Sequence, residues 1–261
     1  MKRIAGIFLS AFFSVLLLSG CDSSPEKSPQ VRDIRKRGVL RVGVETGVPG
    51  LGRLVPESGV FQGFEIDLAR ALAKELLKDE AAVQFVPLNP QFRGPVLDNG
   101  DVDIVICHFT ITEERQKQYN FTSPYYTDQV GVMVRNDAGF RSLEDMDGRI
   151  IGVLKNTTSQ AAIKEEADKR GISLKFEEFG SNPEAVASLH AGKVDAFVID
   201  RTILLGYRDG RTKLLDEGFN PQPYGVATRL DKEMLAAYFD SIITAMREDG
   251  RLEALRVKWD L

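Results

Sequence analysis

One seven-residue pattern occurs twice in this chain of 261 residues, and it constrains the fold more than any other feature. Both copies read Leu-x-x-Gly-x-Val-Asp, one beginning at Leu97 and the other at Leu189, and an apolar run follows each. Such a run is typical of a strand buried on both faces of a parallel sheet. The repeat therefore predicts two helix–strand units of similar build. Convergence is the alternative, because helix–glycine–strand junctions are common.

The segments around the two copies follow one another in the same order. The first half gives strands at 40–44, 83–88 and 102–107 and helices at 63–77 and 95–99. The second half gives strands at 149–154, 173–179 and 193–200 and helices at 159–170 and 183–191. This agreement makes convergence the weaker explanation. It predicts an α/β protein of two lobes, each a mainly parallel sheet flanked by helices.

Two segments join the predicted lobes. An apolar run at 129–135 leads out of the first half, and 225–228 leads from the second into an amphipathic helical segment at 232–261. A chain that enters the second lobe and returns makes two crossovers, which predict a hinge with a cleft between the lobes. We expect lobe 1 to comprise 38–131 plus 227–261, and lobe 2 to comprise 132–226.

The N-terminal residues indicate export. Lys2 and Arg3 precede an almost unbroken apolar run at 4–18, which is short for a membrane span and suits a secretory signal. The run ends Leu-Ser-Gly-Cys21, which resembles the lipobox of bacterial lipoproteins and implies lipid attachment to Cys21. An ordinary signal peptide is the alternative. We expect a signal peptide at 1–20, a lipidated tether at 21–37, and a membrane-anchored protein facing the periplasm or the exterior.

Composition excludes several classes of function. The formal net charge is −4 and no basic run occurs, so nucleic acid is not expected as a partner. Cys107 is the only cysteine after Cys21, so no intrachain disulfide forms, and His108 and His190 are too few for a multi-histidine metal site. We expect a monomer without cofactor or metal. The glycine-rich stretch at 47–52 lacks the spacing of a dinucleotide-binding fingerprint.

The segment from Asp103 to Arg115 contains the first candidate binding residue. It turns from apolar to polar within a few residues, and Thr112 is a suitable helix N-cap that places Arg115 in the first helical turn. Ligands of open α/β sheets bind at the carboxyl ends of the strands. A guanidinium there, beside threonine hydroxyls and free helix amides, suits a carboxylate. An ordinary surface arginine is the alternative.

Six motifs in order support a family resemblance. They are Gly63-Phe-Glu-Ile-Asp-Leu-Ala69, Leu97-x-x-Gly-x-Val-Asp103, Thr110-Ile-Thr-Glu-Glu-Arg115, Phe121-Thr-Ser-Pro-Tyr-Tyr126, Asp147-Gly-x-x-x-Gly-Val153 and Val194-Asp-Ala-Phe-Val-Ile-Asp200. From about residue 39 onward the chain resembles the polar amino-acid-binding proteins of bacterial ABC importers, the family 3 extracellular solute-binding proteins. The resemblance implies a two-lobed, type II periplasmic-binding-protein-like fold that closes on an amino acid and delivers it to permease subunits.

The resemblance also assigns roles at the ligand's α-carbon. Arg115 with Thr110 is similar to the group that grips the α-carboxylate from lobe 1, and Thr158 with Thr157 to the group that closes on it from lobe 2. Asp200 resembles the aspartate that receives the α-ammonium. Further members of the implied site are the carbonyl of residue 108 and Tyr224. At His108 and Asn156 the chain departs from the family's usual small residues, which puts the shape of the pocket in doubt.

Two charged residues give opposed signals about the ligand side chain. Arg93 resembles an arginine that meets the side-chain carboxylate in binders of acidic amino acids. Glu45 stands where binders of basic or amide ligands carry an acid. If both reach the pocket, Arg93 and Arg115 balance Glu45 and Asp200, and a neutral glutamine side chain fits best. Pairing of Glu45 with Arg53 or another surface cation is the alternative, which would leave a glutamate or aspartate binder.

Other functions compatible with this fold stay open at the level of sequence. One is a binder of a basic amino acid, selected by Glu45. Another is an enzyme resembling the cyclohexadienyl dehydratases, in which Glu45 and His108 would supply an acid and a base. A third is a secondary role as a surface adhesin. The zwitterion clamp and the lipid anchor favour an amino-acid receptor over an enzyme.

Overall fold

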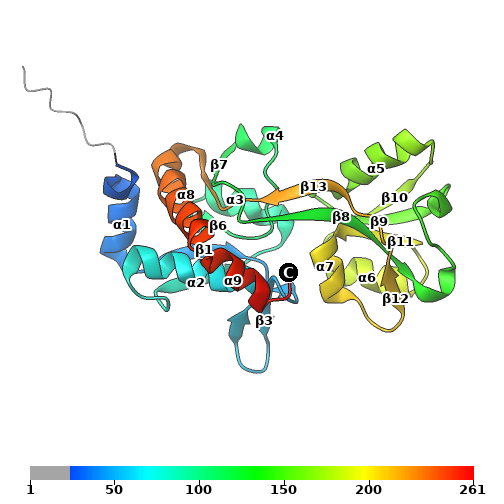
Figure 1. The fold of residues 1–261 in the computed structure, drawn as a ribbon, viewed down its shortest axis with the longest axis horizontal. Helices are drawn as coiled ribbons and strands as arrows, with labels where there is room; N and C mark the ends of the chain where they lie inside the picture. The colour runs from blue at the N-terminus through cyan, green and yellow to red at the C-terminus, as the bar shows by residue number, and fades with distance from the viewer. Residues whose placement is uncertain (1–23) are drawn as a thin grey trace, which may run out of the picture.

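The computed structural model describes residues 24–261, which form two α/β lobes joined by two long strands (Figure 1). The predicted fold class is confirmed. Cys21 and the predicted signal peptide lie outside the described residues. Within residues 24–261, no helix is both long enough and apolar enough to cross a membrane.

The sheet of lobe 1 has the strand order β5-β1-β6-β14-β7. Its strands are β1 (Leu40–Val44), β5 (Val83–Pro87), β6 (Ile104–Val105), β7 (Tyr119–Phe121) and β14 (Ala227–Arg229). The first three strands are parallel, as the repeat predicts, whereas β14 returns from lobe 2 and pairs antiparallel with β6 and β7. β6 is shorter than the predicted strand at 102–107, because the chain turns at His108, whose φ is +34°.

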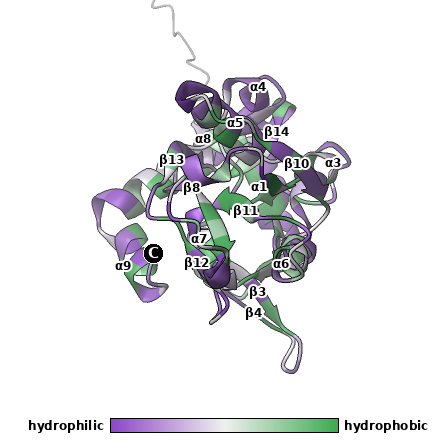
Figure 2. Ribbon diagram, turned by 90° about the vertical axis from the view of Figure 1, so that its right-hand side faces the viewer, coloured by the Kyte–Doolittle hydropathy of each residue, from purple (hydrophilic) through white to green (hydrophobic). Residues whose placement is uncertain are grey.

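The sheet of lobe 2 has the order β10-β9-β11-β8-β12, and β13 also pairs with β8. Its strands are β8 (Tyr126–Arg135), β9 (Ile150–Leu154), β10 (Lys175–Phe179), β11 (Ala196–Asp200), β12 (Thr212–Leu214) and β13 (Phe219–Tyr224). Strands β9, β10 and β11 are parallel, which repeats the arrangement of lobe 1. Every residue of β11 is buried, and Figure 2 shows this strand in the hydrophobic colour while the edge strand β10 is hydrophilic.

The two crossovers are the antiparallel neighbours β8 and β13, which run side by side between the lobes (Figure 1). The predicted boundary at 131/132 falls inside β8, and all ten residues of β8 form one strand of the second sheet. This strand is continuous because β11, β12 and β13 all hydrogen-bond to it. An isolated bridge between Thr110 and Tyr224 joins the end of β13 to lobe 1.

Helices cover both sheets. In lobe 1 these are α1 (Pro29–Arg37), α2 (Phe64–Leu77), α3 (Arg93–Asp98), α4 (Glu113–Gln116), α8 (Glu233–Glu248) and α9 (Arg251–Lys258). In lobe 2 they are α5 (Ser159–Arg170), α6 (Asn182–His190) and α7 (Arg201–Tyr207). The predicted C-terminal helical segment is divided into α8 and α9 by Gly250, whose φ of +82° leaves the helical region.

Residues 29–37 belong to the folded part of lobe 1, contrary to the prediction of a lipidated cysteine and tether at 21–37. They form helix α1, in which Ser28 accepts a hydrogen bond from the Val31 amide and Gly38 ends the helix. Val31 and Ile34 lie on one face and are buried in the core of lobe 1. The sequence is rich in charge here, and these two apolar positions are what dock the helix.

The glycine-rich stretch after β1 forms a small three-stranded sheet of β2 (Gly47–Val48), β3 (Gly52–Val55) and β4 (Val60–Gln62). It lies beside the N-terminus of α2, where a side chain at Gly63 would collide with the carbonyl group of Leu51. The phenol of Tyr207, in lobe 2, donates a hydrogen bond to the Gly47 carbonyl in this sheet. The small sheet therefore contacts lobe 2.

Candidate functional site

Arg115 lies in the first turn of α4, as predicted, because the Thr112 hydroxyl accepts a hydrogen bond from the Arg115 amide (3.2 Å). Its guanidinium donates to the Thr110 carbonyl (2.9 Å) and, across the cleft, to the Asn156 carbonyl (3.3 Å). Burial and then the charge of Arg93 lower the pKa of Arg115 to about 10. Arg115 is therefore still a cation at neutral pH.

Phe109 holds Arg115 and Arg93 in place. Its ring centroid lies 4.8 Å from the guanidinium carbon of Arg115 and 5.2 Å from that of Arg93, so both cations contact one aromatic ring. The sequence analysis did not identify Phe109, because an aromatic residue after a buried strand is usually core. Arg93 is itself buried and donates from Nε to the Cys107 sulfur (3.5 Å).

Seven of the nine predicted ligand-binding residues line one cavity, namely Arg93, His108, Thr110, Arg115, Thr157, Thr158 and Asp200. Two apolar residues, Ile199 and Ile203, complete its wall. The other two predicted residues, Glu45 and Tyr224, lie behind the wall, where they contact His108 and Asp200. The cavity adjoins a larger cleft between α4 and α5, which Arg93, Arg115 and Thr158 also line.

The lobe 2 side of the cavity is formed at the N-terminus of α5. The Thr158 hydroxyl donates to the side-chain oxygen of Gln222 (2.6 Å), and the Thr157 hydroxyl donates to the Leu154 carbonyl (2.9 Å). Both hydroxyl protons are thus engaged within lobe 2. Each oxygen keeps lone pairs that can accept a further hydrogen bond.

Asp200 is the last residue of β11 and lines the same cavity. Its Oδ2 accepts a hydrogen bond from the Tyr224 phenol (2.6 Å), and its Oδ1 is buried with no hydrogen-bond partner among the described residues. Burial, followed by the nearby charge of Asp128, raises the pKa of Asp200 to about 6. Asp128 also accepts from the Thr202 amide (2.9 Å), which fixes the start of α7. A cation beside Oδ1 would satisfy Asp200.

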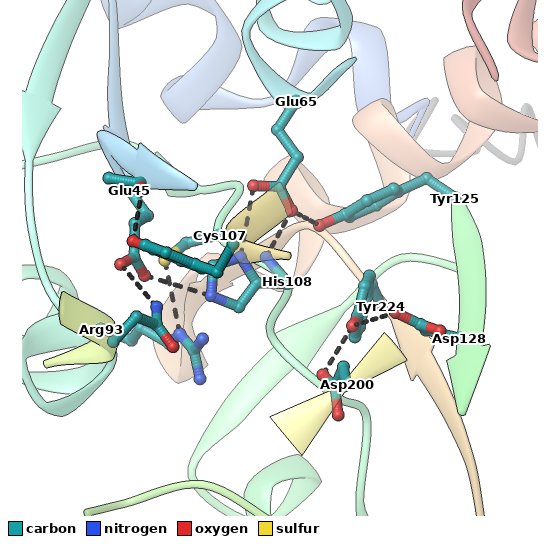
Figure 3. Close-up of polar contacts among 12 residues, drawn as sticks. Glu45, Glu65, Arg93, Cys107, His108, Tyr125, Asp128, Asp200 and Tyr224 are labelled. Atoms are coloured by element: carbon teal, nitrogen blue, oxygen red, sulfur yellow. Dashed lines mark hydrogen bonds and ion pairs between the residues drawn. The ribbon is translucent and has the colours of Figure 1, made fainter. Parts of the chain in front are cut away.

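His108 lies between two buried glutamates (Figure 3). Its Nε2 is 3.2 Å from Glu45 and its Nδ1 is 3.5 Å from Glu65. The backbone amide of His108 also donates to Glu65, as does the Tyr125 phenol (2.6 Å). The structure therefore contradicts a surface pair between Glu45 and Arg53, because Glu45 is buried and its ion-pair partner is His108.

These contacts determine the protonation of the cluster. Burial and the charge of Arg93 act to lower the pKa of His108, but hydrogen bonds to Glu45 and Glu65 outweigh them and raise it to about 9. Burial would raise the pKa of Glu65, but its hydrogen bond and charge interaction with His108 lower it. At neutral pH the imidazole is therefore protonated and Glu65 is ionised.

Glu65 is the most important residue that the sequence analysis missed. It lies in the first turn of α2, a position where an acidic residue is ordinary because it faces the positive end of the helix dipole. Its side chain is completely buried, and nothing in the local pattern indicates that. With Glu65 and a protonated His108 included, the charged groups that line the cavity or contact His108 are three cations (Arg93, His108, Arg115) and three anions (Glu45, Glu65, Asp200). Asp128 is a further buried carboxylate, which lies behind Asp200 and outside this set.

A carboxylate oxygen of Glu45, the Cys107 sulfur and a ring nitrogen of His108 lie within 4.8 Å of one another, which is a donor set that metal ions use. Burial raises the pKa of the Cys107 thiol to about 12, and the thiol already accepts from Arg93. Glu45 and His108 neutralise each other as an ion pair. We therefore assign this cluster to charge neutralisation within the protein.

The two lobes contact each other around the cavity. Besides the bond from Arg115 to Asn156, the side-chain amide of Asn182 donates to Glu45 (3.4 Å), and Tyr207 bonds to Gly47. Each of these bonds joins lobe 1 to lobe 2. The cavity is thus enclosed by groups from both lobes, which is the arrangement that binds a small ligand away from water.

Residues 40–261 match the family described as bacterial extracellular solute-binding proteins, family 3. The chain belongs to this family. It is 31% identical over 270 residues to the ABC transporter glutamine-binding protein GlnH of Bacillus subtilis, covering 99% of this chain and 97% of that protein. It is 33% identical over 238 residues to a glutamine-binding protein of Geobacillus stearothermophilus, covering 84% and 89%.

A solved structure with a similar fold is an ancestral arginine-binding protein bound to arginine. Its TM-score is 0.74 and its identity 36%, with 85% of this chain and 98% of that chain covered. The family and these relatives are extracellular or periplasmic transport receptors rather than enzymes. This solute-binding protein therefore binds an amino acid and works with the permease of an ABC transporter, as predicted.

Proposed function

We propose that this solute-binding protein captures glutamine as its main ligand. The observation that carries the proposal is the charge balance among the groups that line the cavity or contact His108, in which three cations face three anions. Glutamine is a zwitterion with a neutral side chain, so it adds no net charge to a buried cavity. Burying glutamate or lysine would introduce an unbalanced charge, which is unfavourable by several kcal/mol unless a group turns away or changes protonation.

In the proposed complex the ligand carries one charge to each side of the cavity. Arg115 binds the α-carboxylate beside Thr110, with the N-terminus of α5 at Thr157 and Thr158 closing from lobe 2. Asp200 binds the α-ammonium through Oδ1, which has no protein partner in the described part of the chain. The carbonyl of His108 assists there. The two glutamine-binding relatives support this choice of ligand.

Glutamate or aspartate is the second candidate, and Arg93 is the observation that favours it. Arg93 lines the cavity, so a ligand side-chain carboxylate there would meet its guanidinium. The amide of glutamine also offers an oxygen to a guanidinium, and it adds a donor that a carboxylate lacks. A titration calorimetry screen of the twenty amino acids against protein refolded without ligand decides between them. Tighter binding of glutamate than of glutamine would reject the charge-balance argument.

We further propose that the protein is a lipoprotein held at the membrane through Cys21, beside its permease. The basis is the apolar run at 4–18 and the Leu-Ser-Gly-Cys box that follows it. Several acyl chains on one cysteine anchor a protein stably, whereas one chain does not. Metabolic labelling with a fatty acid tests the attachment.

A further inference from the structure

Glu45, the carboxylate that the sequence analysis linked to basic ligands, forms an ion pair with His108. We propose that His108 is an internal counter-ion that occupies Glu45, so that the site rejects basic amino acids. This inference rests on the proposed function, because it concerns the side-chain end of the same cavity. His108 determines specificity here through its charge and its position, rather than through a bond to the ligand.

The geometry supports this role for His108. His108 lines the cavity and Glu45 does not, and Glu45 lies 3.2 Å from Nε2 of His108 (Figure 3). Glu65 contacts the other ring nitrogen, so the ring is held from both sides. Between cavity and Glu45 there is therefore a fixed cation, and a lysine or arginine side chain would meet it before it met the carboxylate.

The charges lead to the same conclusion. The six charged groups that line the cavity or contact His108 sum to zero while His108 is protonated. Without the imidazolium the sum is one negative charge, which the cationic side chain of arginine or lysine would neutralise and glutamine would not. Uncompensated charge in a buried site is strongly unfavourable, so the preferred ligand should change with this one residue.

Glu45 has little else to pair with. Apart from the His108 contact to Oε2, its described hydrogen bond is the long one from Asn182 to Oε1 (3.4 Å). Arg93 contributes to its surroundings by charge, but the Arg93 Nε hydrogen bond goes to Cys107. Loss of the imidazole would therefore leave Glu45 as an acceptor that faces the space the ring had filled.

The backbone makes the decisive variant practical. His108 has a φ of +34°, a conformation that glycine adopts without the steric cost that a side chain brings. We therefore expect His108→Gly to fold while it removes the charge and opens space beside Glu45. His108→Gln removes the charge and keeps most of the volume, so it separates the two effects. His190→Gln is the matched control, because His190 pairs with Asp209 outside the site.

The experiment is titration of glutamine, arginine and lysine by calorimetry into wild type and these variants, each refolded without ligand. We expect wild type to prefer glutamine, and His108→Gly to shift the ratio of arginine to glutamine affinity by at least about tenfold towards arginine. His108→Gln should shift it in the same direction by less, and His190→Gln not at all. Adding Glu45→Gln to His108→Gly should abolish the increase in arginine affinity relative to glutamine.

Two results would overturn the inference. One is wild-type protein that binds arginine or lysine as tightly as glutamine, because Glu45 would then be accessible despite His108. The other is an unchanged ratio in both His108 variants, with circular dichroism showing that at least one of them is folded. A wild type that binds none of the polar amino acids would count against the proposed function instead. Arginine binding gained by the His108 variants would still support the role of His108.

Discussion

The Tyr224 phenol donates to Oδ2 of Asp200 at 2.6 Å, which leaves Oδ1 of the same carboxylate buried and facing the ligand cavity without a partner. The same phenol oxygen lies 3.3 Å from Oδ2 of Asp128, the residue that fixes the start of α7. One phenol thus orients the carboxylate at the end of β11. Because the Asp128 carboxylate lies close by, the negative charge of Asp200 is destabilised, and a cationic ligand group beside Asp200 would stabilise it.

The first prediction follows from the raised pKa of Asp200, about 6 in the absence of ligand. The ligand ammonium needs the ionised carboxylate, so binding at acidic pH must first remove a proton. We expect affinity to fall about tenfold between pH 7.5 and pH 5, with proton release on binding near pH 6. Calorimetry in buffers of different ionisation enthalpy measures that release. In Asp200→Asn the affinity should be at least about a hundredfold weaker and proton release absent.

The second prediction concerns Arg115, whose guanidinium contacts Phe109, Thr110 and Asn156 together. Truncation removes the cation that faces the ligand carboxylate and one of the bonds between the lobes. We expect Arg115→Ala to weaken binding by at least about a hundredfold, on the order of 2–5 kcal/mol. Exposed Arg211 supplies the control, and Arg211→Ala should bind normally. Near-wild-type affinity of Arg115→Ala would show that Arg115 does not bind the ligand α-carboxylate.

The third prediction tests the charge balance from the acidic side. Glu45→Lys replaces the anion next to His108 by a cation, so the site gains positive charge and His108 loses the partner that favours its protonation. We expect the preference to move towards glutamate and aspartate and away from glutamine. Competition between the two ligands in one titration measures the change. If the ratio of glutamate affinity to glutamine affinity is unaltered, Glu45 does not contribute to ligand selection.

Local patterns were sufficient to predict the position of Arg115 and the strand that ends at Asp200, whereas the site role of Asp200 came from the family resemblance. Thr112 caps a helix whose first turn must contain Arg115, and an apolar strand that ends in Asp200 places that carboxylate at the edge of the sheet. The repeat of strand and helix likewise predicted both sheets. These features depend on residues close together in the sequence, where helix and strand periodicity carry the information.

The inner cluster depends on contacts between distant residues, so it could not be predicted in this way. Glu65 meets His108 across 43 positions, and Asn182 meets Glu45 across 137. Glu65 in isolation looks like an exposed acidic residue of a first helical turn. Its burial follows from the turn at His108, whose positive φ brings its amide to the carboxylate. Helix α1 was missed because only Val31 and Ile34 of its nine residues are buried.

The fourth prediction concerns Cys21, which lies outside the described residues. If it carries lipid, Cys21→Ser should move the protein from the membrane fraction to the soluble fraction, because no helix within 24–261 could anchor it. Cys107→Ser is the matched control, since Cys107 is buried in lobe 1, and this variant should stay at the membrane. Immunoblots of the two fractions give the readout. Full retention of Cys21→Ser at the membrane would show that another anchor exists.

The last prediction uses His108 as a probe of folding stability. Its pKa rises from 6.5 to about 9 on folding, because Glu45 and Glu65 favour the protonated ring more than burial opposes it. A raised folded-state pKa stabilises the protein fully below pH 6.5, and that contribution is lost as the pH rises through 9. It is on the order of a few kcal/mol. We expect the free energy of unfolding of the ligand-free wild type, measured by urea denaturation, to fall between pH 6 and pH 9.5. The fall in His108→Gln should be smaller, and the difference between the two falls should equal this contribution of His108. Parallel curves for the two proteins would mean that His108 is neutral in the folded state, and the counter-ion role would fail with it.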